Sequence, residues 1–425
     1  MCVKIPMRKI NGIYRFQLMT KTTSNYFRQY FLLLTVSMLW FTNCYSQTPP
    51  VRDTNYNYSI PKSFEDGIKI GDLNNAKIDV NKITELTKLI LNDAFPNIHS
   101  LLIAKDNKLV YENYFSGQDE NWGSSLGYAK HDIDTLHDIR SISKSVVAAC
   151  IDIAIQQKKI KSIDDPIFNY LTDYAKFKTP QNEKITIRHL LTMSSGLKWD
   201  EDVPHGTTAN SETQMERSID PVEYVLSKPM DTTPGKIWKY NSGGVQVLAE
   251  IIKAVSGDSI DKFAEKFLFT PLGIKDYKWI KSSDTAIFFN LGKVFTRKDF
   301  QAAASGLRLT SRDLLKFGLL YLNKGKWNDK QILTENWVSE TLKTQILRGN
   351  DSQTNGYSYL FWTQTDTVDK KAFQLLTARG NGGQRIFVNK ESNLVVVITA
   401  GNYNKKDIVK DGQLAFDEYI LPALH

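Results

Sequence analysis

Cysteine is scarce in this chain, because Cys2, Cys44 and Cys150 are the only ones among 425 residues. A disulfide-dense scaffold is therefore excluded. Long apolar runs are equally scarce: the one present is Phe31–Phe41, about a dozen residues and so short for a bilayer span. A polytopic membrane protein is excluded as well. The remaining composition, 41% hydrophobic and 24% charged, is that of an ordinary globular protein.

The run Phe31–Phe41 has the length of a signal-peptide core. Six basic residues and no acidic one precede it: Lys4, Arg8, Lys9, Arg15, Lys21 and Arg28. Small residues at Cys44 and Ser46 follow, where a signal peptidase cleaves. We predict a signal peptide at residues 1–46 and an exported protein, periplasmic or secreted. A membrane tether through an uncleaved segment is the alternative, and lipidation of Cys44 fits the flanking residues poorly.

Export changes the charge balance of the chain. The formal net charge of +8 falls to +2 when the six basic residues of segment 1–46 are removed. A nearly neutral chain has no electrostatic preference for nucleic acid, so we expect no nucleic-acid partner. Cys150 would then be the one cysteine left, so no intramolecular disulfide could form. A lone cysteine in an apolar helix is typically a small buried residue.

Metal-ligand spacing is also missing from the sequence. The histidines form no helical pair around a glutamate, and no cysteine pair has ligand spacing. They are His99, His131, His137, His189, His205 and His425. We predict a structural role for each of them, no metal and no cofactor.

Hydrophobic patterns predict strands near both ends of the chain and helices between them. Two β-hairpins are expected, one from Ser100–Ala104 and Leu109–Phe115, the other from Gln384–Val388 and Leu394–Thr399. Helices are expected at Ile83–Ala94, Lys144–Gln157, Ile187–Thr192, Val245–Val255, Ser311–Leu322, Glu335–Leu342 and from about Lys406 to Tyr419. The predicted fold is α+β, with an antiparallel sheet built from both chain ends and an inserted helical lobe.

Gly123–Gly127 (GSSLG) has the spacing of a nucleophile elbow, which would make Ser125 a nucleophile. Such an elbow requires a buried strand before the serine and a helix after it. The flanking residues here are polar on both sides, so we predict that Ser125 is not catalytic.

Ser141 and Lys144 are a better candidate pair, three residues apart at the start of a nearly apolar helix. Residues at this spacing share one helix face, so the amine can reach the hydroxyl. Burial and the helix N-terminus both disfavour the charged amine, which favours a neutral base that activates the serine. The alternative is a serine that caps the helix beside a lysine that extends to solvent.

Two later segments strengthen this candidate. Tyr240 lies at a loop-to-helix junction, where a tyrosine can move a proton if nearby cations lower its pKa. The glycine-rich segment Arg379–Gln384, with Gly382 and Gly383, leads into a strand that we predict to be an edge strand. Such an entry lets backbone N–H groups approach a substrate. A plain hairpin turn is the alternative.

At these residues the sequence resembles the serine β-lactamase and penicillin-binding-protein superfamily. The resemblance is greatest to the branch related to class C β-lactamases, which includes esterases and 6-aminohexanoate-dimer hydrolases. The matching segments are Asp134–Lys144 (DTLHDIRSISK), His189–Gly196 (HLLTMSSG), Tyr240–Gly244 (YNSGG), Ala304–Leu314 (ASGLRLTSRDL), Tyr357–Trp362 (YSYLFW) and Gly380–Phe387 (GNGGQRIF).

The resemblance implies a β-lactamase/transpeptidase-like α+β fold, in which helices flank an antiparallel sheet beside an all-helical lobe. Residues 47–96 would be a leader and first helix, and residues 97–421 the catalytic domain. Its α/β lobe would take about 80–165 and 300–425, and the helical lobe about 166–299.

The same resemblance implies that Ser141 forms an acyl-enzyme and that Lys144 and Tyr240 move protons. The N–H groups of Ser141 and Gln384 would form the oxyanion hole, with no metal or cofactor. Ser242 and Asn381 depart from the family pattern, which usually has Asn and Lys or His there. These departures bear on substrate recognition at Ser242, Asn381, Gly382 and Gly383.

We therefore predict an exported serine hydrolase that acts on a small ester or amide. The alternative is a penicillin-binding, peptidoglycan-sensing or DD-peptidase-like protein with slow or no turnover.

Overall fold

The computed structural model describes residues 55–281, 299–349, 355–368, 370–405 and 411–424. The predicted signal peptide and the start of the predicted C-terminal helix lie outside these residues, so both stay predictions. Within the described ranges, no helix is both long enough and apolar enough to cross a membrane.

The described strands include a nine-stranded sheet in the order β1-β3-β2-β16-β15-β14-β13-β12-β11. Its strands are β1 (Lys69–Ile70), β2 (Ile98–Lys105), β3 (Lys108–Tyr114), β11 (Ile346–Leu347), β12 (Asn355–Tyr357), β13 (Trp362–Val368), β14 (Lys371–Gly380), β15 (Gln384–Asn389) and β16 (Leu394–Ala400). Strand β16 pairs with β2, so the two chain ends share one sheet as predicted. The pairs are antiparallel except for β1, which is parallel to β3.

Shorter strands form small sheets beside the large one. They are β4 (Gly117–Asn121) with β5 (Ser124–Ala129), β6 (His137–Asp138) with β8 (Leu307–Leu309) and β7 (Lys278–Trp279), and β9 (Lys326–Trp327) with β10 (Lys330–Gln331). The helices are α2 (Val80–Leu91), α3 (Ile142–Gln156), α4 (Ile187–Leu191), α5 (Ser211–Arg217), α6 (Pro221–Leu226), α7 (Ser242–Ser256), α8 (Ile260–Ala264), α9 (Thr270–Leu272), α10 (Ser311–Leu322), α11 (Glu335–Thr341) and α12 (Asp411–Ala415).

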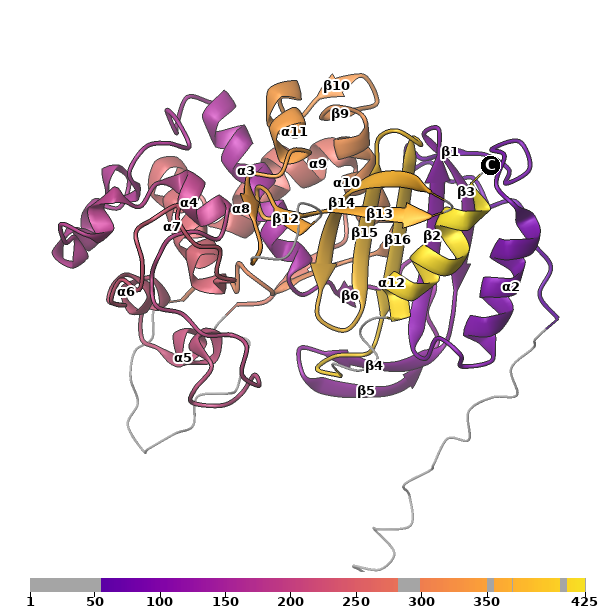
Figure 1. The fold of residues 1–425 in the computed structure, drawn as a ribbon, viewed down its shortest axis with the longest axis horizontal. Helices are drawn as coiled ribbons and strands as arrows, with labels where there is room; N and C mark the ends of the chain where they lie inside the picture. Colours follow the sequence, from indigo (N-terminus) through magenta and orange to yellow (C-terminus); the bar gives the residue numbers. More distant parts are fainter. Residues whose placement is uncertain (1–54, 282–298, 350–354, 369, 406–410, 425) are drawn as a thin grey trace, which may run out of the picture. The chain divides into compact units, whose positions relative to one another are not determined.

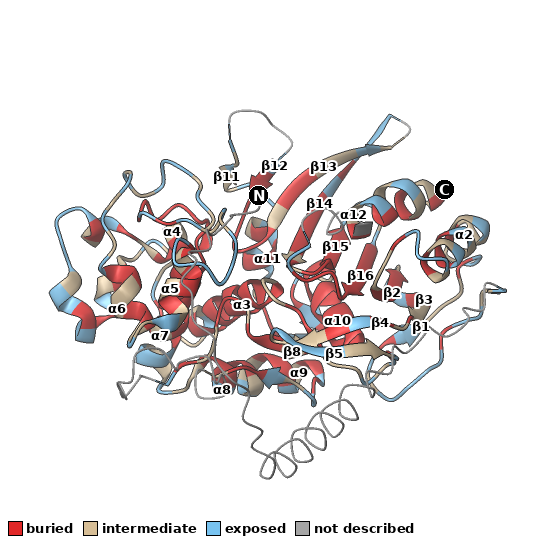
Figure 2. Ribbon diagram, turned by 90° about the horizontal axis from the view of Figure 1, so that it is seen from below, coloured by how far each residue is buried: buried red, intermediate tan, exposed pale blue. Residues whose placement is uncertain are grey.

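Strand alternation divides the apolar side chains of the sheet between two cores. Val395 and Val397 of β16 pack into the core that contains α3 and α10. Val396 and Ile398 face the opposite side and pack with α2 and the C-terminal helical segment. In Figure 1, α2 and α12 lie side by side next to the sheet, and Figure 2 shows that β15, β16 and β2 are buried. The central strands are therefore covered on both faces, as their continuous apolar sequence requires.

Both predicted hairpins are present, as β2–β3 and β15–β16. The prediction that Gln384 opens an edge strand is wrong, because β15 lies between β14 and β16. Strands β13 and β14 were not predicted from the sequence. Polar residues in β13, as in Thr363–Thr367, hide the alternation that signals a strand.

From residue 139 to residue 277 the described chain contains helices and turns and no strand. This stretch begins with α3, which crosses the core, and continues through α4 to α9. The boundary between an α/β lobe and a helical lobe stays a prediction. Cys150 lies fully buried in α3, as predicted for a lone cysteine.

Candidate active site

Ser141 is positioned by the junction between β6 and α3. It occupies the N-cap of α3, yet its side chain makes no capping hydrogen bond. The preceding residue, Arg140, has a positive φ of 50°, an unfavourable backbone conformation for a residue with a Cβ. Arg140 forms an ion pair with Glu120 and lies over the rings of Trp122 and Tyr403. These contacts hold the strained turn that presents Ser141.

Lys144 lies one helical turn after Ser141 and is 1% exposed. Its Nζ is 3.0 Å from Ser141 Oγ and 3.0 Å from the carbonyl oxygen of Ala304. Burial lowers the pKa of Lys144, although the nearby carboxylates of Glu212 and Glu201 act in the opposite direction. A lysine with a lowered pKa can accept the proton of a serine hydroxyl.

Tyr240 lies at the end of the loop that precedes α7, next to this pair. Lys144 Nζ is 5.0 Å from the centre of its ring, and Trp362 stacks on the ring at a centroid distance of 5.9 Å. Burial raises the pKa of Tyr240, and a hydrogen bond with Ser141 only partly opposes this effect. The condition that nearby cations lower this pKa is therefore not met, because desolvation is the largest effect and the charges of Glu201 and Glu212 act in the same direction. The phenol therefore stays protonated at neutral pH.

Glu201 is a partly buried carboxyl at the cavity that sequence reasoning missed. Ser242 donates to it twice, from its N at 2.6 Å and from its Oγ at 2.9 Å, and Trp199 Nε1 donates a third hydrogen bond. Burial, with Glu212 nearby, raises the pKa of Glu201 to about 7. The run Asp200–Asp202 is wholly acidic in the sequence, so nothing there distinguishes the member whose carboxyl accepts these hydrogen bonds.

The raised pKa of Glu201 predicts a pH-dependent stability. Between its ordinary value of 4.5 and about 7, the folded protein holds this proton and the unfolded chain does not. The folded state binds more protons in this window, so its stability falls as pH rises through it. We expect Glu201→Gln to gain roughly 1–3 kcal/mol relative to the wild type between pH 5 and pH 8.

Denaturant unfolding at the two pH values measures this difference. Glu85→Gln, at an exposed position on α2, is the matched control and should show no such trend. An unchanged difference between Glu201→Gln and wild type at pH 5 and pH 8 would contradict a raised pKa.

The predicted third motif forms the turn between β14 and β15. Gly382 and Gly383 have φ values of +93° and +99°. A Cβ on Gly382 would lie 2.5 Å from the Tyr403 ring, so glycine is required there. Asn381 exchanges two hydrogen bonds with Asn404, at 2.6 and 2.9 Å. The Gln384 side chain bonds to the backbone of Ala400, which leaves its own backbone as the group that could face a substrate.

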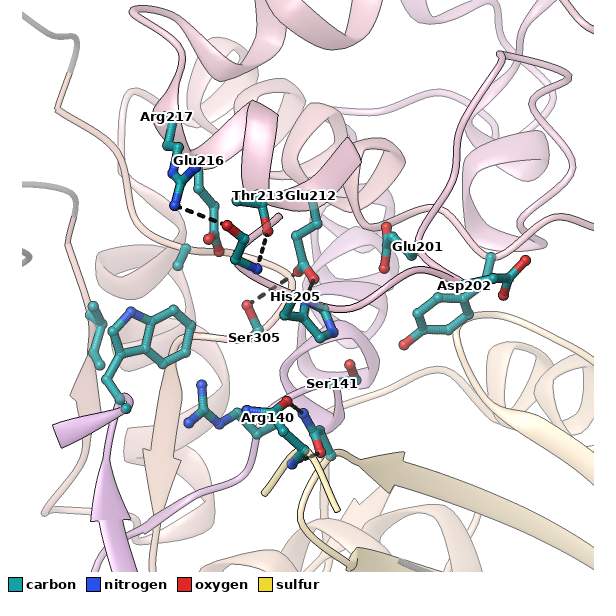
Figure 3. A pocket seen from close by; sticks show the side chains of 18 of the residues that line it. Arg140, Ser141, Glu201, Asp202, His205, Glu212, Thr213, Glu216, Arg217 and Ser305 are labelled. Carbon is teal, nitrogen blue, oxygen red and sulfur yellow. Dashed lines mark hydrogen bonds and ion pairs between the residues drawn. The ribbon is translucent and has the colours of Figure 1, made fainter. Parts of the chain in front are cut away.

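A cavity of about 630 Å³ adjoins this assembly. Ser141, Tyr240 and Asn381 line it, whereas Lys144, Ser242, Gly382, Gly383 and Gln384 lie behind its wall. Figure 3 shows Ser141 at the base of the cavity, with Glu201, His205 and Glu212 across from it. Ser242 therefore reaches the cavity only through Glu201. The roles predicted for all eight residues stay predictions.

Ser125 lies on β5, in an exposed hairpin with β4, where Gly127 N donates to its hydroxyl at 3.2 Å. No helix follows the serine, as a nucleophile elbow would require.

Residues 99–419 match the family model named Beta-lactamase. An uncharacterized protein of Alkalihalophilus pseudofirmus is 27% identical over 318 residues, which cover 70% of this chain and 82% of that protein. A protein of Escherichia coli strain K12, named as a D-alanyl-D-alanine carboxypeptidase, is 24% identical over 246 residues. That match spans 56% of this chain and about half, 54%, of the relative.

Solved structures show the same fold. A class C β-lactamase from Rhodobacter sphaeroides has a TM-score of 0.57 at 15% identity, covering 80% of this chain and 99% of its own. The 6-aminohexanoate-dimer hydrolase homologue from Bacillus anthracis has a TM-score of 0.61 at 18% identity, with 79% and 80% covered. This chain belongs to the β-lactamase family and has the predicted β-lactamase/transpeptidase-like α+β fold. The family and these neighbours are hydrolases.

Proposed function

We propose that this chain is an exported serine hydrolase that cleaves an ester or amide through an acyl-enzyme on Ser141. The observation that carries the proposal is the 3.0 Å contact between Ser141 Oγ and the buried Lys144 amine at the wall of a cavity. The Ser141 hydroxyl makes no helix cap, so it is available for chemistry. A nucleophile beside an uncharged base is the arrangement that acyl transfer requires.

The first half-reaction forms the acyl-enzyme. Neutral Lys144 takes the proton of Ser141, and Oγ attacks the substrate carbonyl carbon to form a tetrahedral intermediate. The backbone N–H groups of Ser141 and Gln384 would stabilise its oxyanion. The carbon–oxygen or carbon–nitrogen bond then breaks, and the departing alcohol or amine receives the proton that Lys144 took from Ser141, relayed by the Tyr240 hydroxyl, so that Lys144 is uncharged again.

The second half-reaction hydrolyses the acyl-enzyme. A water molecule loses a proton to the same base and attacks the acyl carbon. The bond to Ser141 Oγ breaks, and the hydroxyl recovers its proton. Fast release of an acyl label would support an enzyme. Permanent acylation would instead support the penicillin-binding or DD-peptidase-like alternative that the carboxypeptidase-named relative suggests.

The cavity lining favours substrates without negative charge. Five acidic side chains line it against four lysines and arginines, and the raised pKa of Glu201 leaves that group only partly ionised at neutral pH. The acidic residues are Glu120, Glu201, Asp202, Glu212 and Glu216. Lys239 is paired with Asp202 at 2.7 Å, and Arg140 is paired with Glu120. Neither Arg379 nor Arg385 lines the cavity, so these arginines do not supply the cation that Asn381 lacks. Arg385 donates instead to the carbonyl groups of Gly380 and Gln384.

We expect p-nitrophenyl butyrate to be turned over with a kcat/KM several-fold to tenfold above that of a chromogenic cephalosporin. The cephalosporin carboxylate meets a neutral Asn381 and an acidic lining, and losing one charge-assisted hydrogen bond costs about 1 kcal/mol or more. Asn381→Lys should raise the cephalosporin value several-fold and leave the ester value nearly unchanged. Asn381→Gln, which stays neutral, is the matched control. A cephalosporin value above the ester value would contradict the neutral-substrate proposal.

A further inference from the structure

Four polar side chains meet in the interior, away from the cavity lining. They are His99 on β2, Asp119 on β4, His131 in the connection after β5, and His137 on β6. No spacing in the sequence links them, since they are brought together by strands of three different sheets. All four are at most 7% exposed. Burying three imidazoles and a carboxylate together is costly unless they share a partner.

The four residues have the separation of a ligand set. One ligand atom from each lies within 4.8 Å of the others. Asp119 Oδ2 is 3.4 Å from His131 Nε2, and Asp119 Oδ1 is 4.0 Å from His99 Nδ1. The ligand atoms of a tetrahedral zinc site lie about 3.3–3.4 Å apart, so one pair already has this spacing. The His99 and His131 rings are stacked with centroids 3.7 Å apart, so these side chains must rotate to close the remaining gaps when an ion binds.

Backbone carbonyl groups orient two of the histidines. His99 Nε2 is 3.0 Å from the carbonyl oxygen of Gln118, and His131 Nδ1 is 2.7 Å from that of Phe115. Each ring therefore directs its other nitrogen toward Asp119. In a metal-ligating histidine, the ring nitrogen that does not bind the metal usually donates to a backbone carbonyl or a carboxylate, which orients the ring. A Cβ on Gly401 would lie 2.6 Å from His99 Cε1, so the chain packs tightly against this ring.

Hydrogen bonds do not explain why His137 is buried in this cluster. Neither of its ring nitrogens has a hydrogen-bond partner among the described residues, and the same holds for His99 Nδ1. Arg308, which lies nearby, forms an ion pair with Asp138 at 2.8 Å, so the charge of Arg308 is compensated. Buried polar atoms without partners are rare in native proteins and require an explanation.

We propose that His99, Asp119, His131 and His137 bind one divalent transition-metal ion, of which Zn²⁺ fits best. Three imidazoles and one carboxylate are ligands that Zn²⁺ accepts, and four protein ligands make a closed tetrahedral site. A closed, buried site with no open position is structural and not catalytic. This inference does not rest on the proposed function.

The site would stabilise the segment that presents the nucleophile. His137 is four residues before Ser141, and the intervening Asp138 pairs with Arg140 at 3.3 Å. A metal ion bound here would link β2, β4 and β6 and thereby anchor the strained turn at Arg140. Removal of the ion should lower the melting temperature by roughly 5 °C or more.

Metal analysis of the full chain, purified through a tag without histidine, tests the proposal. We expect about one Zn²⁺ per chain after dialysis against excess Zn²⁺. Replacement by Co²⁺ should give the intense visible absorption of a tetrahedral site. Asp119→Asn, which keeps the side-chain shape, and His137→Ala should each bind Zn²⁺ at least tenfold more weakly. His205→Ala, a half-exposed histidine outside the cluster, should keep the full metal content.

Two results would overturn the proposal. One is a wild-type chain that stays metal-free and shows no change in melting temperature with Zn²⁺, which would leave the cluster as a hydrogen-bonded network. The other is full metal content in the Asp119→Asn and His137→Ala variants. If neither variant folds, X-ray absorption of the wild-type zinc protein decides, because fewer than three imidazole ligands would contradict the assignment.

Discussion

Replacing Ser141 by alanine should abolish ester turnover, with a loss in kcat of roughly 10⁴-fold or more. The substitution removes the atom that would form the acyl bond and leaves Lys144 without its partner at 3.0 Å. Stability should change little, because the hydroxyl does not cap α3. Kinetics with p-nitrophenyl butyrate, together with intact mass after a fluorophosphonate label, measure both turnover and covalent modification.

Ser125→Ala is the matched control for this experiment. Ser125 is an exposed serine in the β4–β5 hairpin, so its loss should leave labelling and rate intact. Labelling that survives in Ser141→Ala, or that disappears in Ser125→Ala, would refute the assignment of the nucleophile. A melting curve for each variant separates a catalytic loss from a folding defect.

Replacing Tyr240 by phenylalanine should lower kcat by roughly 10²–10⁴-fold, the usual contribution of a positioned proton donor or acceptor. The ring contacts with Trp362 and Lys144 do not involve the hydroxyl, so the fold should be retained. Because the phenol is protonated at neutral pH, the loss should be greatest for substrates with a poor leaving group, which depend most on proton donation.

A comparison of p-nitrophenyl butyrate with an alkyl butyrate measures this dependence. Tyr224→Phe removes a hydroxyl from a ring that contacts Lys228 and Trp199, and it should leave both rates unchanged. A Tyr240→Phe enzyme with nearly the wild-type rate would show that Lys144 works with another proton relay.

Several local features could be predicted because short-range chemistry determines them. Ser141 and Lys144 share a helix face whatever packs around them, since the spacing of three residues is nearly one turn. The hairpins β2–β3 and β15–β16 follow from apolar strands that flank turn residues. Helix α10 has the bounds Ser311–Leu322 that the periodicity predicted.

Other features depend on contacts between residues far apart in the chain. Burial raises the pKa of Tyr240, and no local motif reports how deeply a ring will be covered. Glu201 lies in an acidic run. It becomes a partly buried, hydrogen-bonded carboxyl only because Ser242 and Trp199 donate to it in the folded protein. Strand β15 is central because β14, which the sequence analysis did not predict, pairs with the edge of β15 that we expected to be free.

The sequence alone therefore determined the contact between Ser141 and Lys144, the family and the mixture of strands and helices. Each of these follows from spacing, periodicity or ordered motifs within a few residues. The tertiary structure decided which charges are buried, which residues line the cavity, and that His99, Asp119, His131 and His137 meet. Desolvation and ligand geometry depend on distances in space, and strands from separate sheets set those distances only when the chain folds.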